Sequence, residues 1–181
     1  MSSPEYQTYL DAQIAKTTRM GQLHTPRVSQ LIQRWQLVQR VEGLRVLSVG
    51  CRNGHELDAL TMVGCDVTGI DLVAQDPRIQ EMDMHAPTFP DHTFDAVFSC
   101  HSLEHAWDVP QALTAWHRVT KPGGTWVIEV PIRFQPTAVD RWDAGSSLGL
   151  VKACRAHLRT VLYHGEVAVG HPVAQLIGIV R

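Results

Sequence analysis

Short strand-like runs that alternate with helical patterns constrain the fold of this chain more than any other feature. From residue 45 onward, β-rich runs lie at 45–50, 66–71 and 94–100, with further candidates at 78–83 and in GTWVIEVPI, after the turn KPGG. The segments HELDALTMVG and PQALTAWHRV have helical spacing; Gly64 ends the first, and Pro110 lies in the first turn of the second. Strands alternating with helices indicate an α/β fold, a doubly wound, mostly parallel sheet with helices on both faces.

The segments on either side of this core complete a single domain, which is the default for a chain of 181 residues. Residues 4–20 and 28–41 have helical spacing and form an N-terminal helical cover within residues 1–43, ahead of a core at 44–132. In the last part, 133–181, a helix near 146–158 precedes two apolar runs that can pair as an edge hairpin. The two N-terminal helices either only cover one face of the sheet or also close a ligand site.

Composition excludes several classes of partner. The formal net charge is -2 and no block of like charges occurs, so neither nucleic acid nor a membrane surface is expected to bind. The four cysteines lie far apart without a C-x-x-C pair, which favours reduced thiols over a disulfide framework. No signal peptide and no apolar run long enough to span a membrane is recognisable, so we predict a cytoplasmic protein.

The turn after the first strand, SVGCRNGHEL, is the expected ligand site, because parallel sheets bind ligands at the carboxyl ends of their strands. The dinucleotide pattern G-x-G-x-x-G fails at Arg52 and His55, which disfavours a nicotinamide oxidoreductase. The shorter pattern G-x-G-x-G fails only at Arg52. Asp71 follows the second strand and can accept hydrogen bonds from the two ribose hydroxyls of a nucleoside. The alternatives are a glycine turn that serves packing alone and an acid that only caps a strand end.

A second motif, HSLEH at 101–105, has the H-x-x-E-H spacing of a group of zinc proteases. Such a site needs His101 and His105 on one helix face. The strand-like run reaches Cys100, and Pro110 disfavours helical geometry at Val109, which leaves room for about one turn. With no third ligand in reach, we expect no metal here and interpret the segment as the end of the fourth strand and the loop after it.

In order along the chain, these motifs resemble those of the class I S-adenosylmethionine-dependent methyltransferases. VLSVGCRNG is similar to the first motif, V-L-D-x-G-C-G-x-G, and VTGIDL to the second. The run MDMHAPTFPDHTFDAVFSCHSLEH resembles the segment that carries an acid, F-P-D-x-[ST]-F-D and L-E-H, and TKPGGTWVIEVP resembles the L-K-P-G-G turn and fifth strand. The resemblance covers about residues 44–132. It implies a Rossmann-like sheet of seven strands with the last one antiparallel, and transfer of a methyl group from S-adenosylmethionine to an acceptor.

The resemblance also implies roles for single residues. Gly50 and Cys51 would pass their backbone along the methionyl part of the cofactor, and Ser99 would offer its backbone to the cofactor's amino group. The adenosine part would be held by Asp71 at the ribose, Leu72 and Met84 at the adenine ring, and Asp83 at the adenine amino group. His101 is expected to line the acceptor pocket and is a candidate general base, because an unperturbed histidine can take up a proton near neutral pH.

Two positions depart from the family pattern. Ser48 replaces an acid that helps to orient the cofactor, and Arg52 replaces the middle glycine. If position 52 needs a positive φ, an arginine there costs roughly 1–2 kcal/mol. The alternative is therefore a non-catalytic binding or scaffold protein with weak or lost cofactor binding. For an enzyme, we expect a small-molecule acceptor rather than a macromolecule, and a possible homo-oligomer.

Overall fold

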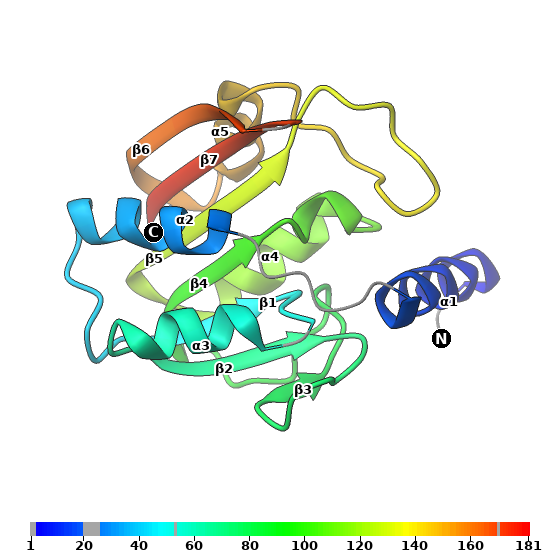
Figure 1. Cartoon of the computed structure of the whole chain (residues 1–181), viewed down its shortest axis with the longest axis horizontal. Coiled ribbons are helices and arrows are strands. Elements are labelled where there is room, and N and C mark those ends of the chain that lie inside the picture. Colours follow the sequence, from blue (N-terminus) through cyan, green and yellow to red (C-terminus); the bar gives the residue numbers. More distant parts are fainter. Residues whose placement is uncertain (1–2, 20–25, 53, 170) are drawn as a thin grey trace.

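One seven-stranded sheet runs through the part of the chain that the computed structural model describes, which is residues 3–19, 26–52, 54–169 and 171–181. The strand order is β3-β2-β1-β4-β5-β7-β6, with β7 antiparallel to both of its neighbours (Figure 1). The strands are β1 (Arg45–Val49), β2 (Asp66–Asp71), β3 (Ile79–Glu81), β4 (Phe94–Cys100), β5 (Thr120–Pro131), β6 (Leu158–Val169) and β7 (His171–Val180). Strand order reverses between β1 and β4, which is where sheets of this kind bind ligands.

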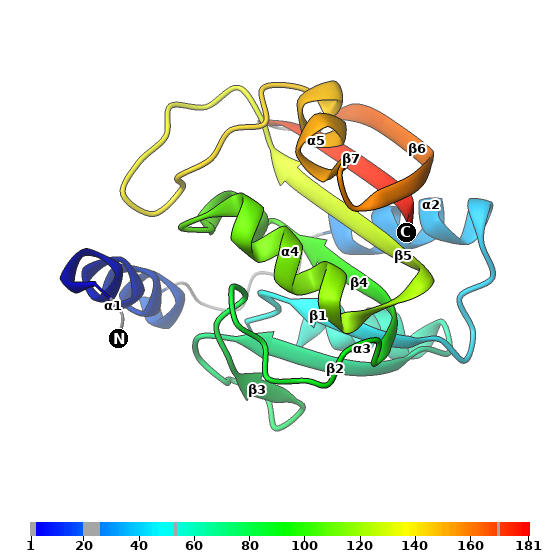
Figure 2. The ribbon, with the colours of Figure 1, turned by 180° about the vertical axis from the view of Figure 1, so that it is seen from behind.

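Helices cover both faces of the sheet. On one face lie α2 (Pro26–Val38) and α3 (His55–Met62), and on the other lie α4 (Val109–Val119) and α5 (Ser147–Cys154) (Figures 1 and 2). A short 3-10 helix, η1 (Leu103–His105), follows β4. None of the helices in the described ranges is both long and apolar enough to cross a membrane.

The central strand β1 shows why the sheet needs both layers. Val46 belongs to the apolar cluster on the side of α2 and α3, and Leu47 belongs to the cluster on the side of α4 and α5. Successive strand side chains point to opposite faces, so a strand that is apolar at consecutive positions must be covered twice. Ser48 is as deeply buried as its neighbours and points to the same side as Val46.

The structure confirms most of the expected elements. The runs 66–71 and 94–100 are strands with those bounds, and the two C-terminal runs form the antiparallel pair β6–β7. Several elements differ in length from the expected ranges, among them α2, which ends at Val38 and not at 41, and β3, which is limited to Ile79–Glu81. The expected KPGG turn is part of β5, where a register shift against β4 takes up the extra residues, and α5 ends at Cys154 rather than near 158. Residue 20 of the first expected helix and residue 170 between β6 and β7 lie outside the described residues.

The first helix, α1 (Pro4–Arg19), was expected to belong to the N-terminal helical cover, but it does not pack on a face of the sheet. It stands beyond the sheet at the carboxyl ends of β1 and β2, away from both helical layers (Figures 1 and 2). Its sequence explains the difference, because α1 has few apolar residues on one stripe, whereas α2 buries Val28, Leu31, Ile32 and Trp35. Only α2 therefore carries the apolar face that packing on a sheet requires.

Shortening Leu47 tests the double-sided core. Leu47 is 0% exposed in the central strand, so Leu47→Ala should lower the free energy of unfolding by roughly 2–5 kcal/mol through lost burial and a residual cavity. The matched control is Leu37→Ala on α2, where the side chain is 85% exposed and the change should stay within roughly 0.5 kcal/mol. Denaturant unfolding measures both, and equal losses would contradict the assigned core.

Candidate functional site

Two adjoining cavities lie at the carboxyl ends of the central strands. The small cavity, of about 50 Å³, is lined by residues after β1, β2 and β3 and by α1, and the large cavity, of about 690 Å³, extends toward β5 and β7. Gly50, Arg52, His101 and His105 line both. The turn after β1 and the turn after β4 therefore form the boundary between the two cavities.

The glycine turn begins with a residue that no side chain could replace. Gly50 has a φ of +75°, and a Cβ added to it would lie 2.3 Å from the Cβ of Ser102. Its N–H donates to the carbonyl of Ile70 at 2.8 Å, which fixes the turn against β2. Glycine is thus required at position 50 both by backbone conformation and by the close approach of the β4–η1 connection.

Arg52 adopts the conformation that the glycine pattern anticipates. Its φ is 42°, in the left-handed region, and its N–H donates to Oδ2 of Asp71 at 2.9 Å. The position therefore does need a positive φ, and an arginine there carries the expected cost of roughly 1–2 kcal/mol. The bond to Asp71 comes from the backbone, so any residue at this position could make it, and it ties the glycine turn to the end of β2.

Asp71 and Leu72 both line the small cavity. The Asp71 carboxylate accepts from the backbone of Arg52 and, at 3.3 Å, from the N–H of Val73. Burial raises the pKa of the Asp71 carboxyl, and these backbone donors act against that rise. The side chain is thus held rigidly at the strand end, with its carboxylate at the cavity wall.

Asp83 and Met84 also line the small cavity, but the Asp83 carboxylate already has protein partners. The Tyr6 hydroxyl donates to Oδ2, and the Nδ1 atom of His85 lies 2.6 Å from Oδ1. Burial alone would raise the pKa of Asp83, but the hydrogen bonds from His85 and Tyr6 bring it below its usual value. The Tyr6 side chain on α1 is therefore already hydrogen-bonded to the carboxylate that is expected to accept from the adenine amino group.

Helix α1 closes the small cavity, which sequence analysis left as the second of two alternatives. Tyr9 and Gln13 line that cavity. The Tyr9 hydroxyl donates to the carbonyl of His105 at 2.7 Å, the Gln13 amide donates to the carbonyl of Val139 at 2.7 Å, and Lys16 pairs with Asp140 at 2.6 Å. The polar stripe of α1 that makes it a poor sheet cover is what binds it to the loops around the site.

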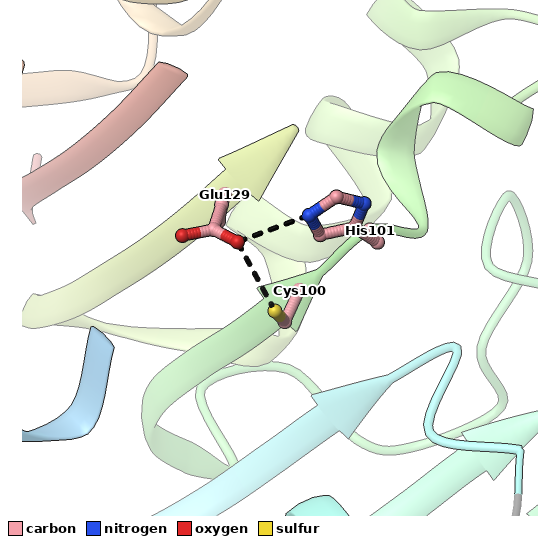
Figure 3. A group of neighbouring side chains, drawn as sticks. All are labelled: Cys100, His101 and Glu129. Carbon is pink, nitrogen blue, oxygen red and sulfur yellow. Dashed lines mark hydrogen bonds and ion pairs between the residues drawn. The ribbon is translucent and has the colours of Figure 1, made fainter. Parts of the chain in front are cut away.

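His101 lies at the junction of the two cavities and touches a buried acid (Figure 3). Its Nε2 atom is 3.0 Å from Oε1 of Glu129 on β5, and Sγ of Cys100 lies 3.7 Å from the same oxygen. The Gln175 amide donates to the other oxygen. Burial alone would raise the pKa of Glu129, yet the donors His101 and Gln175 lower it, so the carboxylate is ionised.

The H-x-x-E-H spacing does not form a helical metal site. Only Leu103–His105 are helical, and His101 precedes them with a φ of 56°. The structure instead brings Cys100, His101 and Glu129 together, with one potential ligand atom from each within 4.8 Å of the others. Oε1 of Glu129 lies within hydrogen-bonding distance of both Cys100 Sγ and His101 Nε2, so these two atoms already have a partner in the protein.

Ser99 lies outside the linings of both cavities. Its side chain is fully buried, and its Oγ is 2.7 Å from Oγ of Ser102, which itself donates to the carbonyl of Val49. Cys51 and the shared Gly50 line the large cavity. The sequence patterns did not indicate that Tyr6, Tyr9 and Gln13 on α1, Arg27, and His171 on β7 contribute to the site. A polar helix ahead of the first strand was the one available signal for α1.

Comparisons with known proteins agree with this arrangement. Residues 47–128 match the family model described as a methyltransferase domain. The chain is 31% identical over 112 residues to a protein of Mycolicibacterium smegmatis named a probable S-adenosylmethionine-dependent methyltransferase, a match that covers 55% of this chain and 44% of the relative. It is 33% identical over 103 residues to a ubiquinone biosynthesis O-methyltransferase of Paracidovorax citrulli, covering 48% of this chain and 43% of the relative.

The fold has a close counterpart among solved structures. The 1,6-didemethyltoxoflavin-N1-methyltransferase of Burkholderia thailandensis, solved with 1,6-didemethyltoxoflavin and S-adenosylhomocysteine, superposes with a TM-score of 0.75 at 16% identity. The alignment covers 99% of this chain and 91% of that chain. The sequence matches, by contrast, span less than half the length of the curated relatives.

Substitutions at position 52 test the strained turn. Because φ is 42° there, Arg52→Val should lower the free energy of unfolding by roughly 1–2 kcal/mol, since a β-branched residue tolerates this region least. Arg52→Gly should leave the free energy unchanged or raise it by up to about 1 kcal/mol. Denaturant unfolding decides, and a more stable Arg52→Val than Arg52→Gly would contradict a left-handed residue 52.

Proposed function

We propose that this chain is a class I S-adenosylmethionine-dependent methyltransferase and that it transfers a methyl group from S-adenosylmethionine to a small organic acceptor, which the family-model match over residues 47–128 supports. The observation that carries the proposal is the pair of adjoining cavities at the switch point of the sheet. Acids at the ends of β2 and β3 surround the small cavity, and the large one is within the usual range for a small-molecule pocket. Gly50, Arg52 and His101 lie between them, where a donor and an acceptor would meet.

The residues of the small cavity fit a nucleoside. Asp71 would accept from the ribose hydroxyls, Leu72 and Met84 would pack on the adenine ring, and Asp83 would accept from the adenine amino group. Gly50 and Cys51 would follow the methionyl part with their backbone, whereas the expected contact of the Ser99 backbone with the amino group is not part of this proposal, because Ser99 lies outside both cavity linings. Gly50 supports this assignment because it lines both cavities, and its lack of a Cβ lets Ser102 pack against the turn and hold it there. When bound, the cofactor supplies the activated methyl group, and the protein supplies position.

In this conformation the small cavity holds about 50 Å³, room for only a few water molecules. A nucleoside therefore requires α1 to shift, and the bond between Tyr6 and Asp83 must open for Asp83 to meet an adenine. Besides its hydrogen bonds, α1 packs the rings of Tyr6 and Tyr9 on Trp107, so the shift would break aromatic as well as polar contacts, which ligand binding would have to replace. After binding, Tyr9 and Gln13 would lie over the nucleoside and exclude water.

The acceptor would occupy the large cavity, with His101 as its general base. If Nε2–H donates to the ionised Glu129, the tautomer is fixed and Nδ1 keeps an electron pair. The Arg27 guanidinium lies 3.2 Å from the same Nε2, and the Glu104 carboxyl lies 3.9 Å from Nδ1. The Nδ1 electron pair would take the acceptor's proton as the acceptor atom attacks the methyl group. Glu129 and Gln175 would thus orient the base in the way a carboxylate orients a catalytic histidine. A cytoplasmic location, as expected from the sequence, completes the proposal.

Cofactor binding is the first test. Calorimetry with S-adenosylhomocysteine should show binding to the wild type, and Asp71→Asn should weaken it by roughly tenfold or more through loss of a charged acceptor. The matched control is Asp66→Asn at the exposed start of the same strand, which should bind as the wild type does. Absence of wild-type binding would favour the non-catalytic alternative.

Methyl transfer is the second test. With tritium-labelled S-adenosylmethionine and fractionated small metabolites as acceptors, His101→Ala should reduce transfer by roughly 10²-fold or more while S-adenosylhomocysteine affinity is kept. His117→Ala on α4, whose ring packs near His157 and away from both cavities, is the control. Wild-type turnover in His101→Ala would remove the base role and leave the methyltransferase assignment intact.

A further inference from the structure

Ser48 and Glu56 form a pair that ties the start of α3 to the middle of β1. Ser48 is 0% exposed, and its Oγ donates to Oε2 of Glu56 at 3.1 Å. Glu56 is the second residue of α3 and lies directly beyond the glycine turn. Its carboxyl group therefore stands beside position 48, where the chain departs from the acid of the family's first motif.

The Glu56 carboxyl group also faces the ligand space. Together with Gly50, Cys51 and Arg52 it lines the large cavity, along the path proposed for the methionyl part of the cofactor. Within the described part of the chain, Ser48 is the one hydrogen-bond donor that the structure gives it. A carboxylate offers about four acceptor positions, so Glu56 keeps capacity for a further donor from the cavity.

The charges around Glu56 favour a cation as that donor. Asp71 on β2 and Glu129 on β5 act on it as like charges, and Arg52 in the glycine turn is the opposing positive charge. The nearby thiols of Cys51 and Cys100 have pKa values well above their ordinary range, mainly through burial, and stay neutral. Once Glu56 ionises, three acids stand against one arginine, so this part of the wall carries an excess of negative charge.

We propose that Glu56 is the carboxylate that receives the α-ammonium group of the cofactor's methionyl part, from α3 instead of from β1. This inference rests on the proposed function, since it assigns a residue to the cofactor of that reaction. Ser48 becomes a positioning residue, whose hydroxyl holds the carboxyl group in place. The chain has therefore moved the acid by eight positions along the sequence while keeping it at the same end of β1.

The protonation state of Glu56 makes the proposed ion pair detectable through the pH dependence of binding. Burial, with a smaller contribution from Asp71 and Glu129, raises the pKa of Glu56 to about 8, while Ser48 and Arg52 oppose the rise. The free protein is thus mostly protonated at Glu56 near pH 7. An arriving ammonium group favours the ionised form, so the Glu56 O–H proton leaves to solvent as the ion pair forms. Affinity should then rise with pH until Glu56 is ionised in the free protein.

Calorimetry with S-adenosylhomocysteine, which carries the same α-ammonium group, tests the assignment. Between about pH 6 and pH 8, wild-type affinity should rise by up to about tenfold per pH unit. Repeating the titration in buffers of different ionisation enthalpy should reveal a proton released on binding. Glu56→Gln should bind at least roughly tenfold more weakly near pH 8 and lose this rise. Comparison with the variant removes any contribution from histidines that line the same cavity.

A rescue separates a charge role from a structural one. Ser48→Asp in the Glu56→Gln background returns an acid to β1 and should restore most of the affinity. Asp58→Asn, on the same helix but paired with Arg78 away from the cavities, should bind as the wild type does. Wild-type affinity and pH dependence in Glu56→Gln, or no proton released by the wild type, would overturn the role of Glu56.

These experiments test the role of Glu56 and the proposed function separately. If wild-type binding is weakened by Asp71→Asn but not by Glu56→Gln, the methyltransferase assignment stands and the role of Glu56 falls. If the wild type binds no S-adenosylhomocysteine at any pH, both fall. Thermal melting confirms that each variant is folded, and Ser48→Asp in the Glu56→Gln background gives a second variant for the comparison of affinity and proton release.

Discussion

The close contact between Gly50 and Ser102 is the constraint on which the site depends. Because residue 50 has no Cβ, the connection after β4 can lie directly on the turn after β1, and a hydrogen bond from Ser102 to Val49 holds it there. This contact brings His101 to the same boundary as Arg52, although the two residues are 49 positions apart along the chain. A methyl side chain at position 50 would separate the two turns and disconnect the acids of β2 from the histidine of β4.

The acids near the two cavities differ in the hydrogen-bond donors that the protein gives them. In the small one, Asp71 is held by backbone donors, and Asp83 is held by Tyr6 and His85. The protein thereby keeps these acids in place before any ligand arrives, at the cost of covering Asp83 with α1. Near the large cavity, Glu129 is ionised and fully supplied with donors, whereas Glu56 has a single donor and a raised pKa. Of these two buried acids, Glu56 is the one suited to meet a new cation.

Agreement between sequence and structure is best where a pattern reports a local property. The runs at 66–71 and 94–100 became strands with those bounds, because β-branched and aromatic residues bounded by glycine or polar turns leave few alternatives. Agreement is weaker at the N-terminus, where α1 has helical spacing but closes a cavity. Helical periodicity identifies a helix, and only the surfaces available to it decide what it covers. Ser99 illustrates the same limit, since position at a strand end does not determine whether a residue reaches the cavity.

Sequence alone predicted the succession of strands and helices, a glycine turn after the first strand and acids at the ends of β2 and β3. Those properties follow from backbone conformation and hydrophobic periodicity, which are encoded within a few residues. Only the tertiary structure decided that Tyr6 holds Asp83, that Glu129 orients His101 and that Glu56 stands beside Ser48. Each of these pairs joins side chains from different elements, and the packing of whole helices and strands sets their distances. Position 48 therefore has no acid of its own, but in the folded protein α3 brings the Glu56 carboxyl group next to it.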